Sequence, residues 1–377
     1  MDAMSTLIDV PPGLNGVAVT DTTIGDVLGD EGRFHYRGHD AIDLARTRSF
    51  EEVWHLVAAG HLPDDAELAA FRRAVGAARA LPPSLGPVLE PLARAAGATL
   101  GRIRAALSIA ADDLGLRPLI DLDPDQRAAQ ATRVAAVVPT IAAALHRASL
   151  GLEPVDADAG AGHAAAYLQM VTGDAPSAAA ARAVEQYLIL TVDHGFNAST
   201  FTARVVASTG ADLADVVGAA LGALAGPLHG GAPSRALDAV DAIGDPERTT
   251  AWVEAELAAG RRIMGFGHAV YRDRDPRSDL LREIALGLGG DLVDRAVDVE
   301  GRVVSALRRA KPDRALPSNV EFFAGAVMAA AGLPRSMFTP TFAVSRTVGW
   351  CAHAVEQAAQ GKLIRPSSRY VGPPPTR

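Results

Sequence analysis

The segment AAAARAVEQYLILTVDHGFNASTFTARVVAST, which spans residues 178–209, indicates the fold class most directly. It is rich in good helix formers, and its apolar residues return at intervals of three and four, as on one face of a helix. Three other stretches have a similar composition and spacing: residues 40–59, 64–80 and 125–148. At a usual length of roughly 11 to 12 residues, about a dozen or more helices would fit the chain. We therefore predict a mostly α fold.

The sequence departs from the helical pattern near its N-terminus and at breaks rich in Gly and Pro. Residues 16–37, GVAVTDTTIGDVLGDEGRFHYR, are rich in Val and Thr with Gly and Asp at their break, which predicts one short β-hairpin. Residues 151–162 are rich in Gly, Ala and Asp. We predict a surface loop there rather than a domain linker, because a helical pattern resumes directly afterwards.

The composition is that of a folded protein, and it restricts the partners. Hydrophobic residues make up 49% of the chain and charged residues 21%, unlike disordered sequences. The length of 377 residues suits two lobes or one large helical body. The net charge of −8 argues against nucleic-acid and anionic-membrane partners. An anionic small substrate would need arginines held locally against this overall charge.

The cysteine content and the N-terminus bear on the cellular location. Cys351 is the only cysteine, which excludes a disulfide framework and a thiolate metal cluster and fits a reducing cytoplasm. The first residues lack a secretory signal pattern. The longest apolar stretches, such as residues 134–145, are too short to span a membrane. We therefore expect a cytoplasmic protein with no membrane partner.

Three glycine-rich breaks contain titratable residues, and the first is AGPLHGGAPS at residues 225–234. Pro227 is predicted to end one helix and the next to begin after Gly231, so that His229 lies near a helix N-terminus. Backbone amides and the helix dipole there disfavour a charged imidazole. A neutral imidazole can donate a hydrogen bond to a developing enolate oxygen. The alternative is a histidine that only caps the break, and this segment alone leaves both open.

The second break is GFGHAVYRDRDPR at residues 265–277. His268 follows two glycines, which let the backbone approach a ligand closely. The arginines that follow have forked donors suited to carboxylates and phosphates, which predicts an anion site. These arginines are Arg272, Arg274 and Arg277. The alternative is a solvated loop in which they pair with the neighbouring aspartates, Asp273, Asp275 and Asp279.

The third break is PSNVEFFAG at residues 317–325. Ser318 followed three residues later by Glu321 matches a capping box, in which the glutamate bonds back to the start of a helix. Alternatively, Glu321 lies beside the apolar Phe322 and Phe323, where its carboxylate could have a raised pKa and act as a general base. The spacing alone does not decide between a structural cap and a catalytic base.

Several common catalytic motifs are absent from the sequence. It contains no GxxxxGK[ST] phosphate loop, no HExxH zinc pair and no GxSxG nucleophile elbow. The glycines before His268 do not continue as a dinucleotide fingerprint, and no strand is predicted before them. We therefore expect neither a bound metal nor a nucleotide cofactor.

Taken in order, these segments resemble the citrate synthase family, including its 2-methylcitrate synthases. The N-terminal segments at residues 13–45 and 50–63 are similar to the opening of the family. Six further segments resemble its active-site motifs: DHGFNAST, GPLHGGAPS, GFGHAVYRDRDPR, SNVEFFAG, FAVSRTVGW and LIRPSSRYVGP. The resemblance runs over most of the chain, and six motifs in order are far more specific than any one of them.

The resemblance implies a citrate-synthase-like two-domain helical fold with a short N-terminal β-hairpin. Its large domain would comprise residues 1–229 and 334–377, and a small domain at residues 230–333 would close over the substrates. It also implies a homodimer with shared active sites, because residues 334–377 would include an arm that reaches the partner subunit. Arg365, on that arm, would enter the neighbouring site.

The resemblance further implies roles for individual residues. The catalytic residues would be His229, His268 and Glu321. Oxaloacetate would be bound by His194, His229, His268, Arg277, Arg346 and Arg365. Coenzyme A would be bound by Met264, Gly265, Gly267, Arg272 and Asn319. One position departs from the family motif Asn-Val-Asp-Phe, because Glu321 stands where Asp is usual and moves the carboxylate outward by one methylene.

The implied reaction joins acetyl-coenzyme A to oxaloacetate with water, giving citrate and coenzyme A, and needs no cofactor. The sequence leaves two alternatives open. The first is a 2-methylcitrate synthase that uses propionyl-coenzyme A. The second is a catalytically inactive member that binds coenzyme A thioesters for regulation, for which the substitution at Glu321 is the only support.

Overall fold

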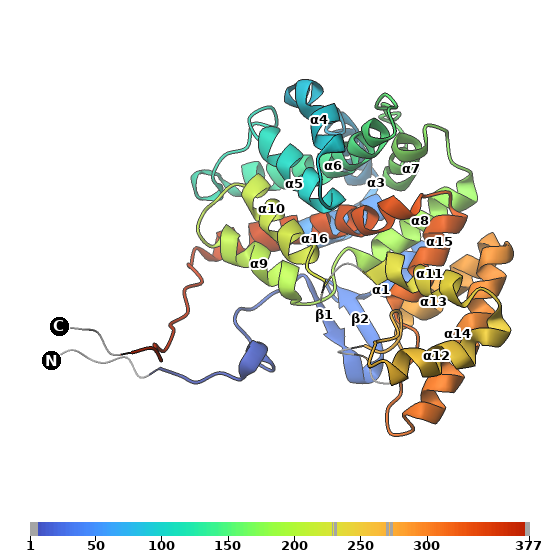
Figure 1. The fold of residues 1–377 in the computed structure, drawn as a ribbon. Helices are drawn as coiled ribbons and strands as arrows, with labels where there is room; N and C mark the ends of the chain where they lie inside the picture. Colours follow the sequence, from blue (N-terminus) through green and yellow to red (C-terminus); the bar gives the residue numbers. More distant parts are fainter. Residues whose placement is uncertain (1–6, 228, 230–231, 269–270, 272–273, 374–377) are drawn as a thin grey trace.

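The computed structural model describes residues 7–373, except residues 228, 230–231, 269–270 and 272–273, and it describes residues 232–235 by their backbone alone. Helices dominate this part of the chain, with one small sheet near the N-terminus (Figure 1). The helices are α1 Ala41–Thr47, α2 Phe50–Ala59, α3 Asp65–Ala77, α4 Leu89–Arg94, α5 Thr99–Ile109, α6 Pro124–Ser149, α7 His163–Thr172, α8 Ala178–Thr191, α9 Ala198–Ala207, α10 Leu213–Leu224, α11 Ala232–Ile243, α12 Thr249–Ala258, α13 Pro276–Leu288, α14 Asp291–Ala310, α15 Val320–Ala330 and α16 Phe338–Gln360. Short 3₁₀ helices lie at Pro12–Leu14, Gly29–Glu31, Pro83–Val88, Leu119–Asp121, Pro246–Arg248 and Arg335–Met337.

The mostly α prediction is confirmed, but two of the four predicted helical stretches are interrupted. Residues 40–59 form α1 and α2, because Ser49 starts a new helix through a capping box with Glu52. Residues 178–209 form α8 and α9, because the Asn197 side chain caps a new N-terminus by accepting from the amides of Ser199 and Thr200. Both breaks have cap signals in the sequence that the apolar periodicity hides.

The N-terminal hairpin is confirmed and has a third strand. Strands β1 Gly25–Leu28 and β2 Arg33–Tyr36 pair antiparallel, with Gly25 opposite Tyr36 and Leu28 opposite Arg33. The two-residue β3, His39–Asp40, pairs with β2 and was not predicted. Phe34 and Tyr36 point inward on β2, and each is 1% exposed. The sheet therefore supplies two buried aromatic side chains to the interior.

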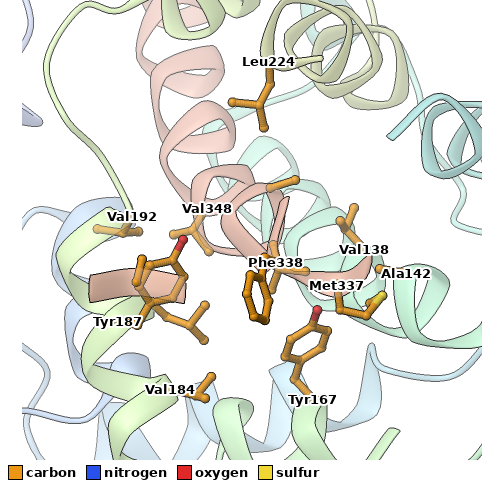
Figure 2. Packing of buried hydrophobic residues seen from close by; sticks show 14 of the residues in the cluster. Val138, Ala142, Tyr167, Val184, Tyr187, Val192, Leu224, Met337, Phe338 and Val348 are labelled. Carbon is orange, nitrogen blue, oxygen red and sulfur yellow. The ribbon is translucent and has the colours of Figure 1, made fainter. Parts of the chain in front are cut away.

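The core of the main helical body is built around α16, which packs against α6, α9 and α10 and also contacts α2 and α8. Figure 2 shows Phe338 and Val348 of this helix among apolar side chains that include Tyr167 of α7 and Tyr187 of α8. Burial of each such side chain stabilises the fold by about 1.5 to 3 kcal/mol. Helix α16 is therefore held on several sides.

Helix α6 is the long helix next to α16, and it contains the apolar run at residues 134–145. The prediction that this run is too short to span a membrane needs correction, because the helix extends beyond it on both sides. The helix has 26 residues and, within the described part of the chain, alone passes the length and composition test for a membrane span. However, 78% of its most apolar window is buried inside the fold. Burial in the core accounts for this apolar composition.

One close contact joins α16 to the loop that follows α8. A Cβ atom at Gly349 would lie 2.2 Å from the carbonyl oxygen of Val192, so this approach requires glycine. It brings α16 directly against the start of the loop at residues 192–197, which contains His194. The predicted site residue His194 is therefore in a loop and not within a continuous helix.

Helices α11 to α15 pack largely on one another. Helix α15 contacts α11, α13 and α14, and α12 packs against α14. This group meets the main body where α13 and α15 contact α8 and where α11 contacts α16. The division into domains at residues 230 and 333 stays a prediction.

Candidate active site

The second and third breaks are joined by backbone hydrogen bonds between residues 265–267 and 317–319. The amide of Gly267 donates to the carbonyl of Pro317 at 2.8 Å, and the amide of Asn319 donates to the carbonyl of Gly265 at 2.9 Å. Gly265 and Gly267 have φ values of 84° and 81°, which residues with a Cβ rarely adopt. The pairing brings together the segments that carry His268 and Glu321, and both residues line the same cavity.

His268 is held as a neutral hydrogen-bond donor. Its Nδ1 accepts from the backbone amide of Tyr271 at 3.1 Å, which leaves the proton of the neutral ring on Nε2. Burial, and then the charge of Arg277, lower the pKa of His268 to about 4. Nη2 of Arg277 lies 3.2 Å from that same Nε2. Two donors thus lie side by side, and one oxygen in front of both would accept a hydrogen bond from each.

The predicted pairing of arginines with aspartates is correct for two arginines, but only one of the pairs lies at the surface. Arg274 pairs with Asp279 at 2.5 Å, with 70% and 43% of the two side chains exposed. Arg277 pairs with Asp275 at 2.8 Å, with only 3% and 0% exposed. The idea of a solvated loop is therefore wrong for Arg277. A buried arginine is costly unless it is paired, and this one lies beside His268.

His194 lies in the loop between α8 and α9 and faces the same group. Its Nε2 is 3.0 Å from the hydroxyl of Tyr271, and its ring meets that of His268 edge to face at 5.7 Å. Phe34 of β2 packs against the ring of His194 at 5.5 Å and lies 5.9 Å from the guanidinium of Arg277. Burial, followed by the charge of Arg277, lowers the pKa of His194 well below its usual value. The hairpin thus forms one wall of the site.

Arg346 enters the site from α16 and is 2% exposed. Its Nε donates to the carbonyl of Thr191 at 2.9 Å, and its guanidinium lies 4.7 Å from the ring centre of Phe342. Burial lowers the pKa of Arg346, and the carboxylate of Asp193 opposes that shift. Arginine remains charged under such shifts because its usual pKa exceeds 12. The site therefore contains a second buried positive charge.

His229 lies in the break before α11, as predicted, and is attached to α9. Its Nε2 is 2.8 Å from the Ser199 hydroxyl, which also accepts from the indole of Trp350 at 3.2 Å and can donate to Asn197 at 2.8 Å. Burial, and then the charge of Arg346, lower the pKa of His229 to about 4. The ring is therefore neutral at physiological pH. Ser199 was missed in the sequence, although its place two residues after a capping asparagine marks a helix start.

The structure decides against the capping-box alternative for Glu321. Helix α15 begins at Val320, and its cap is Asn319, whose side chain accepts from the amide of Glu321 at 3.0 Å. The Ser318 hydroxyl donates instead to Glu300 at 2.6 Å. The carboxylate of Glu321 is thus not used as a cap. Burial raises its pKa to about 7, Arg277 opposes the shift, and Asp275 adds to it.

An open cavity of about 1010 Å³ lies along this region. Six of the predicted residues line it: Met264, Gly265, Gly267, His268, Asn319 and Glu321. Its wall also includes four basic residues that the sequence reading missed, Arg261, Arg262, Lys311 and Arg314. They follow the C-terminal ends of α12 and α14, where basic side chains also stabilise the helix, so the sequence offered no separate signal. Arg272 lies outside the described residues.

Arg365 is not part of this cluster. It is exposed, and it belongs to an extended segment that follows α16 and leaves the helical body (Figure 1). The N-terminal segment runs beside it, and an ion pair of 2.7 Å joins Arg369 to Asp9. Large apolar side chains on this segment are exposed, including Tyr370 at 74% and Val371 at 88%.

Metal-ligand spacing occurs at one place among the described residues, at His55, His61 and Glu67 on the surface. None of these residues lines the cavity. The cavity region instead combines neutral histidine donors, buried arginines and a carboxylate with a raised pKa. Such a group can bind a dicarboxylate, donate to a developing oxyanion and remove a proton.

Comparison with known proteins gives consistent matches over nearly the whole chain. A family model described as "Citrate synthase, C-terminal domain" matches residues 13–367. The chain is 37% identical over 369 residues to "Putative citrate synthase 2" of Mycobacterium tuberculosis, covering 97% of this chain and 93% of that protein. It is 40% identical over 364 residues to the "2-methylcitrate synthase" of the same organism, covering 97% and 91%. The solved ternary complex of citrate synthase from Thermoplasma acidophilum with carboxymethyl coenzyme A and oxaloacetate is similar with a TM-score of 0.87 and 28% identity, covering 96% of each chain.

We predict that His229 and His268 stay neutral from pH 8 down to about pH 5, because burial and neighbouring arginines lower the pKa of each to about 4. Nitrogen NMR of histidine-labelled protein measures both the pKa values and the tautomers. The signals are assigned by their loss in His229→Asn and His268→Asn. We expect the His268 signal to report a proton on Nε2, and titration of either ring near its usual value of about 6.5 would contradict the described environment.

Proposed function

Because the chain belongs to the citrate synthase family, whose members are transferases, we propose that it is a citrate synthase that condenses acetyl-coenzyme A with oxaloacetate and water to give citrate and coenzyme A. The observation that carries this proposal is the pair of donors from His268 and Arg277, which lie side by side, with His268 and Glu321 lining the same cavity. The similar Thermoplasma acidophilum structure is described as a complex with oxaloacetate and a coenzyme A derivative. This description supports the same two classes of substrate for the present protein.

Oxaloacetate is a dicarboxylate with a reactive ketone, and the buried cluster has matching groups. Arg277 and Arg346 provide two positive charges in a region with little exposed surface. The Nε2 proton of His268 would be donated to the ketone oxygen as it becomes an alkoxide, and His194 would bind the same substrate. Fixed donors aimed at a developing charge are especially effective where water is excluded.

The proton transfer is assigned to Glu321. Its carboxylate would remove a methyl proton from acetyl-coenzyme A, while His229 donates to the thioester oxygen as the enolate forms. For this donation the proton must lie on Nδ1 of His229, so the single proton of the Ser199 hydroxyl would turn from Asn197 to Nε2 of His229, 2.8 Å away. The enolate carbon then forms a bond to the ketone carbon, and water finally cleaves the citryl thioester.

Coenzyme A would occupy the cavity, with its phosphates near the basic wall that contains Lys311 and Arg314. The glycine backbone at Gly265 and Gly267 and the side chain of Asn319 would contact it more deeply. Arg272 is proposed as a further contact. No metal or other cofactor is needed in this scheme, and a cytoplasmic location is proposed with it.

Propionyl-coenzyme A is the second candidate substrate, because a 2-methylcitrate synthase is among the similar proteins at 40% identity. Its product would be 2-methylcitrate. The two thioesters differ by one methylene, which an apolar pocket distinguishes by roughly 1 to 3 kcal/mol.

We further propose a homodimer in which Arg365 completes the active site of the partner subunit. Arg365 lies on an exposed segment that leaves its own helical body. Leu363, Tyr370 and Val371 on the same segment are more than half exposed, at 56%, 74% and 88%. Contact with a second copy would cover these apolar groups and supply a third arginine.

We expect the protein to release free thiol from acetyl-coenzyme A when oxaloacetate is present, without added metal or nucleotide. The measurement compares kcat/KM for acetyl- and propionyl-coenzyme A, and we expect a preference for acetyl of about tenfold or more. A preference for propionyl would instead assign 2-methylcitrate synthesis. Release of thiol from neither thioester would favour the regulatory alternative.

Glu321→Gln should lower kcat by roughly a hundred- to ten-thousand-fold, because an amide cannot accept the methyl proton. The melting temperature at pH 8 should not fall, since Asn319 provides the cap and a buried carboxylate with a raised pKa destabilises the fold once it is ionised. In the parent, kcat/KM should decrease below about pH 7 as this base becomes protonated. Near-parental turnover by Glu321→Gln would place the base elsewhere.

Glu321→Asp provides the matched comparison, because it keeps the charge and restores the side-chain length usual in the family. It should retain more activity than Glu321→Gln. Equal activity of the two variants would argue against a general base at this position.

Arg365→Ala should damage catalysis in the neighbouring subunit. Subunits that carry Arg365→Ala would be mixed with subunits that carry His268→Ala, each inactive alone. A mixed dimer should regain one intact site of its two. No recovery of thiol release, after subunit exchange has been verified by mass spectrometry, would refute the shared site.

A further inference from the structure

Asp275 is a buried carboxylate that accepts four hydrogen bonds from other groups of the protein. Its Oδ1 accepts from the backbone amide of Arg277 at 3.1 Å and from Nε of Arg277 at 2.9 Å. Its Oδ2 accepts from Nη2 of Arg277 at 2.8 Å and from the backbone amide of Val320 at 3.0 Å. Both oxygens are therefore occupied by donors from two separate segments.

These four bonds join the N-termini of two helices. Asp275 is the N-cap of α13, which begins at Pro276. Val320 is the first residue of α15, so its amide is one of the donors that a helix leaves without an internal partner. The Asp275 side chain thus caps α13 and also accepts a hydrogen bond from the first amide of α15, 45 residues later in the chain.

Each of these helix starts carries one of the groups assigned to the reaction. Arg277, on the first turn of α13, lies beside Nε2 of His268. Glu321 follows Val320 directly on α15. Movement of one helix start relative to the other would change the distance between the group that holds oxaloacetate and the carboxylate that takes the proton.

The pair between Asp275 and Arg277 also lies near two aromatic rings. The guanidinium of Arg277 is 5.6 Å from the ring centre of Tyr271 and 5.9 Å from that of Phe34. Burial would raise the pKa of Asp275, but the charge and hydrogen bonds of Arg277 outweigh it and lower that pKa. The carboxylate therefore stays ionised and keeps all four bonds near neutral pH.

We propose that Asp275 is a positioning residue for the condensation, because its carboxylate ties Arg277 to the first residue of α15 and so fixes Arg277 and Glu321 relative to each other. This inference rests on the proposed function. It assigns Asp275 no contact with substrate. Misplacement of reacting groups by about an ångström can cost a hundredfold in rate, so the loss of this tie should be visible in kcat.

Val320→Pro would remove only the hydrogen bond between Asp275 and the start of α15. Proline lacks the amide that Asp275 accepts, yet it is well tolerated at the first position of a helix. The residue before a proline must be extended, and Asn319 already is, with φ −107° and ψ 177°. Val320→Ala is the matched control, because it also shortens the side chain but keeps the amide.

We expect Val320→Pro to lower kcat by roughly ten- to a hundredfold relative to Val320→Ala. The Kd for oxaloacetate, measured by calorimetry, should stay within about twofold, because Asp275 still holds Arg277. Equal kcat values for the two variants would overturn the proposal. A wild-type protein that shows no condensation at all would instead refute the proposed function.

Asp275→Asn tests the hydrogen bonds between this carboxylate and Arg277. Asparagine has one acceptor oxygen, so its amide group would face donors of Arg277 or Val320. We expect this variant to lower kcat by at least about tenfold and also to weaken oxaloacetate binding. Asp212→Asn is its control, because Asp212 caps α10 at the end remote from His229. Values of kcat and Kd for Asp275→Asn within twofold of those for Asp212→Asn would overturn the proposal. If Val320→Pro does not fold, this comparison by itself tests whether Asp275 is a positioning residue.

Discussion

The buried ion pair between Asp275 and Arg277 is the constraint on which the rest of the site depends. A guanidinium that is only 3% exposed is unfavourable without a partner, and this partner also binds the start of α15. The same arginine lies beside His268, and its charge opposes the rise in the pKa of Glu321. Two functional groups, His268 and Glu321, thus take their positions or their charge states from one pair.

The electrostatics of the site follow from burial combined with the charges of two arginines. Arg277 and Arg346 are both nearly inaccessible, and the histidines around them lose their protons more easily as a result. Neutral histidines are hydrogen-bond donors of directed geometry, which suits a site that must stabilise a developing oxyanion. Glu321 is shifted in the opposite sense, because burial disfavours its charged form.

Elements from the whole chain build this small region. The N-terminal sheet supplies Phe34, the loop after α8 supplies His194, and α16 supplies Arg346. The close approach of Gly349 to Val192 holds the last two together. The C-terminal segment is the exception, because it carries Arg365 away from this assembly, and the proposed dimer would return an equivalent segment from the partner.

The sequence by itself determined the helical class, the hairpin, the loop at residues 151–162 and the identity of the residues to consider. Apolar spacing and cap residues are local properties, so they could be read directly, and the cap signals at Ser49 and Asn197 were present even where periodicity hid the breaks. Only the tertiary structure decided that Asn319 and not Ser318 caps α15, that Arg277 is buried while Arg274 is exposed, and that burial and neighbouring arginines lower the pKa values of the histidines. Each of these depends on burial and on contacts between segments far apart in the chain, which the spacing of neighbouring residues does not specify.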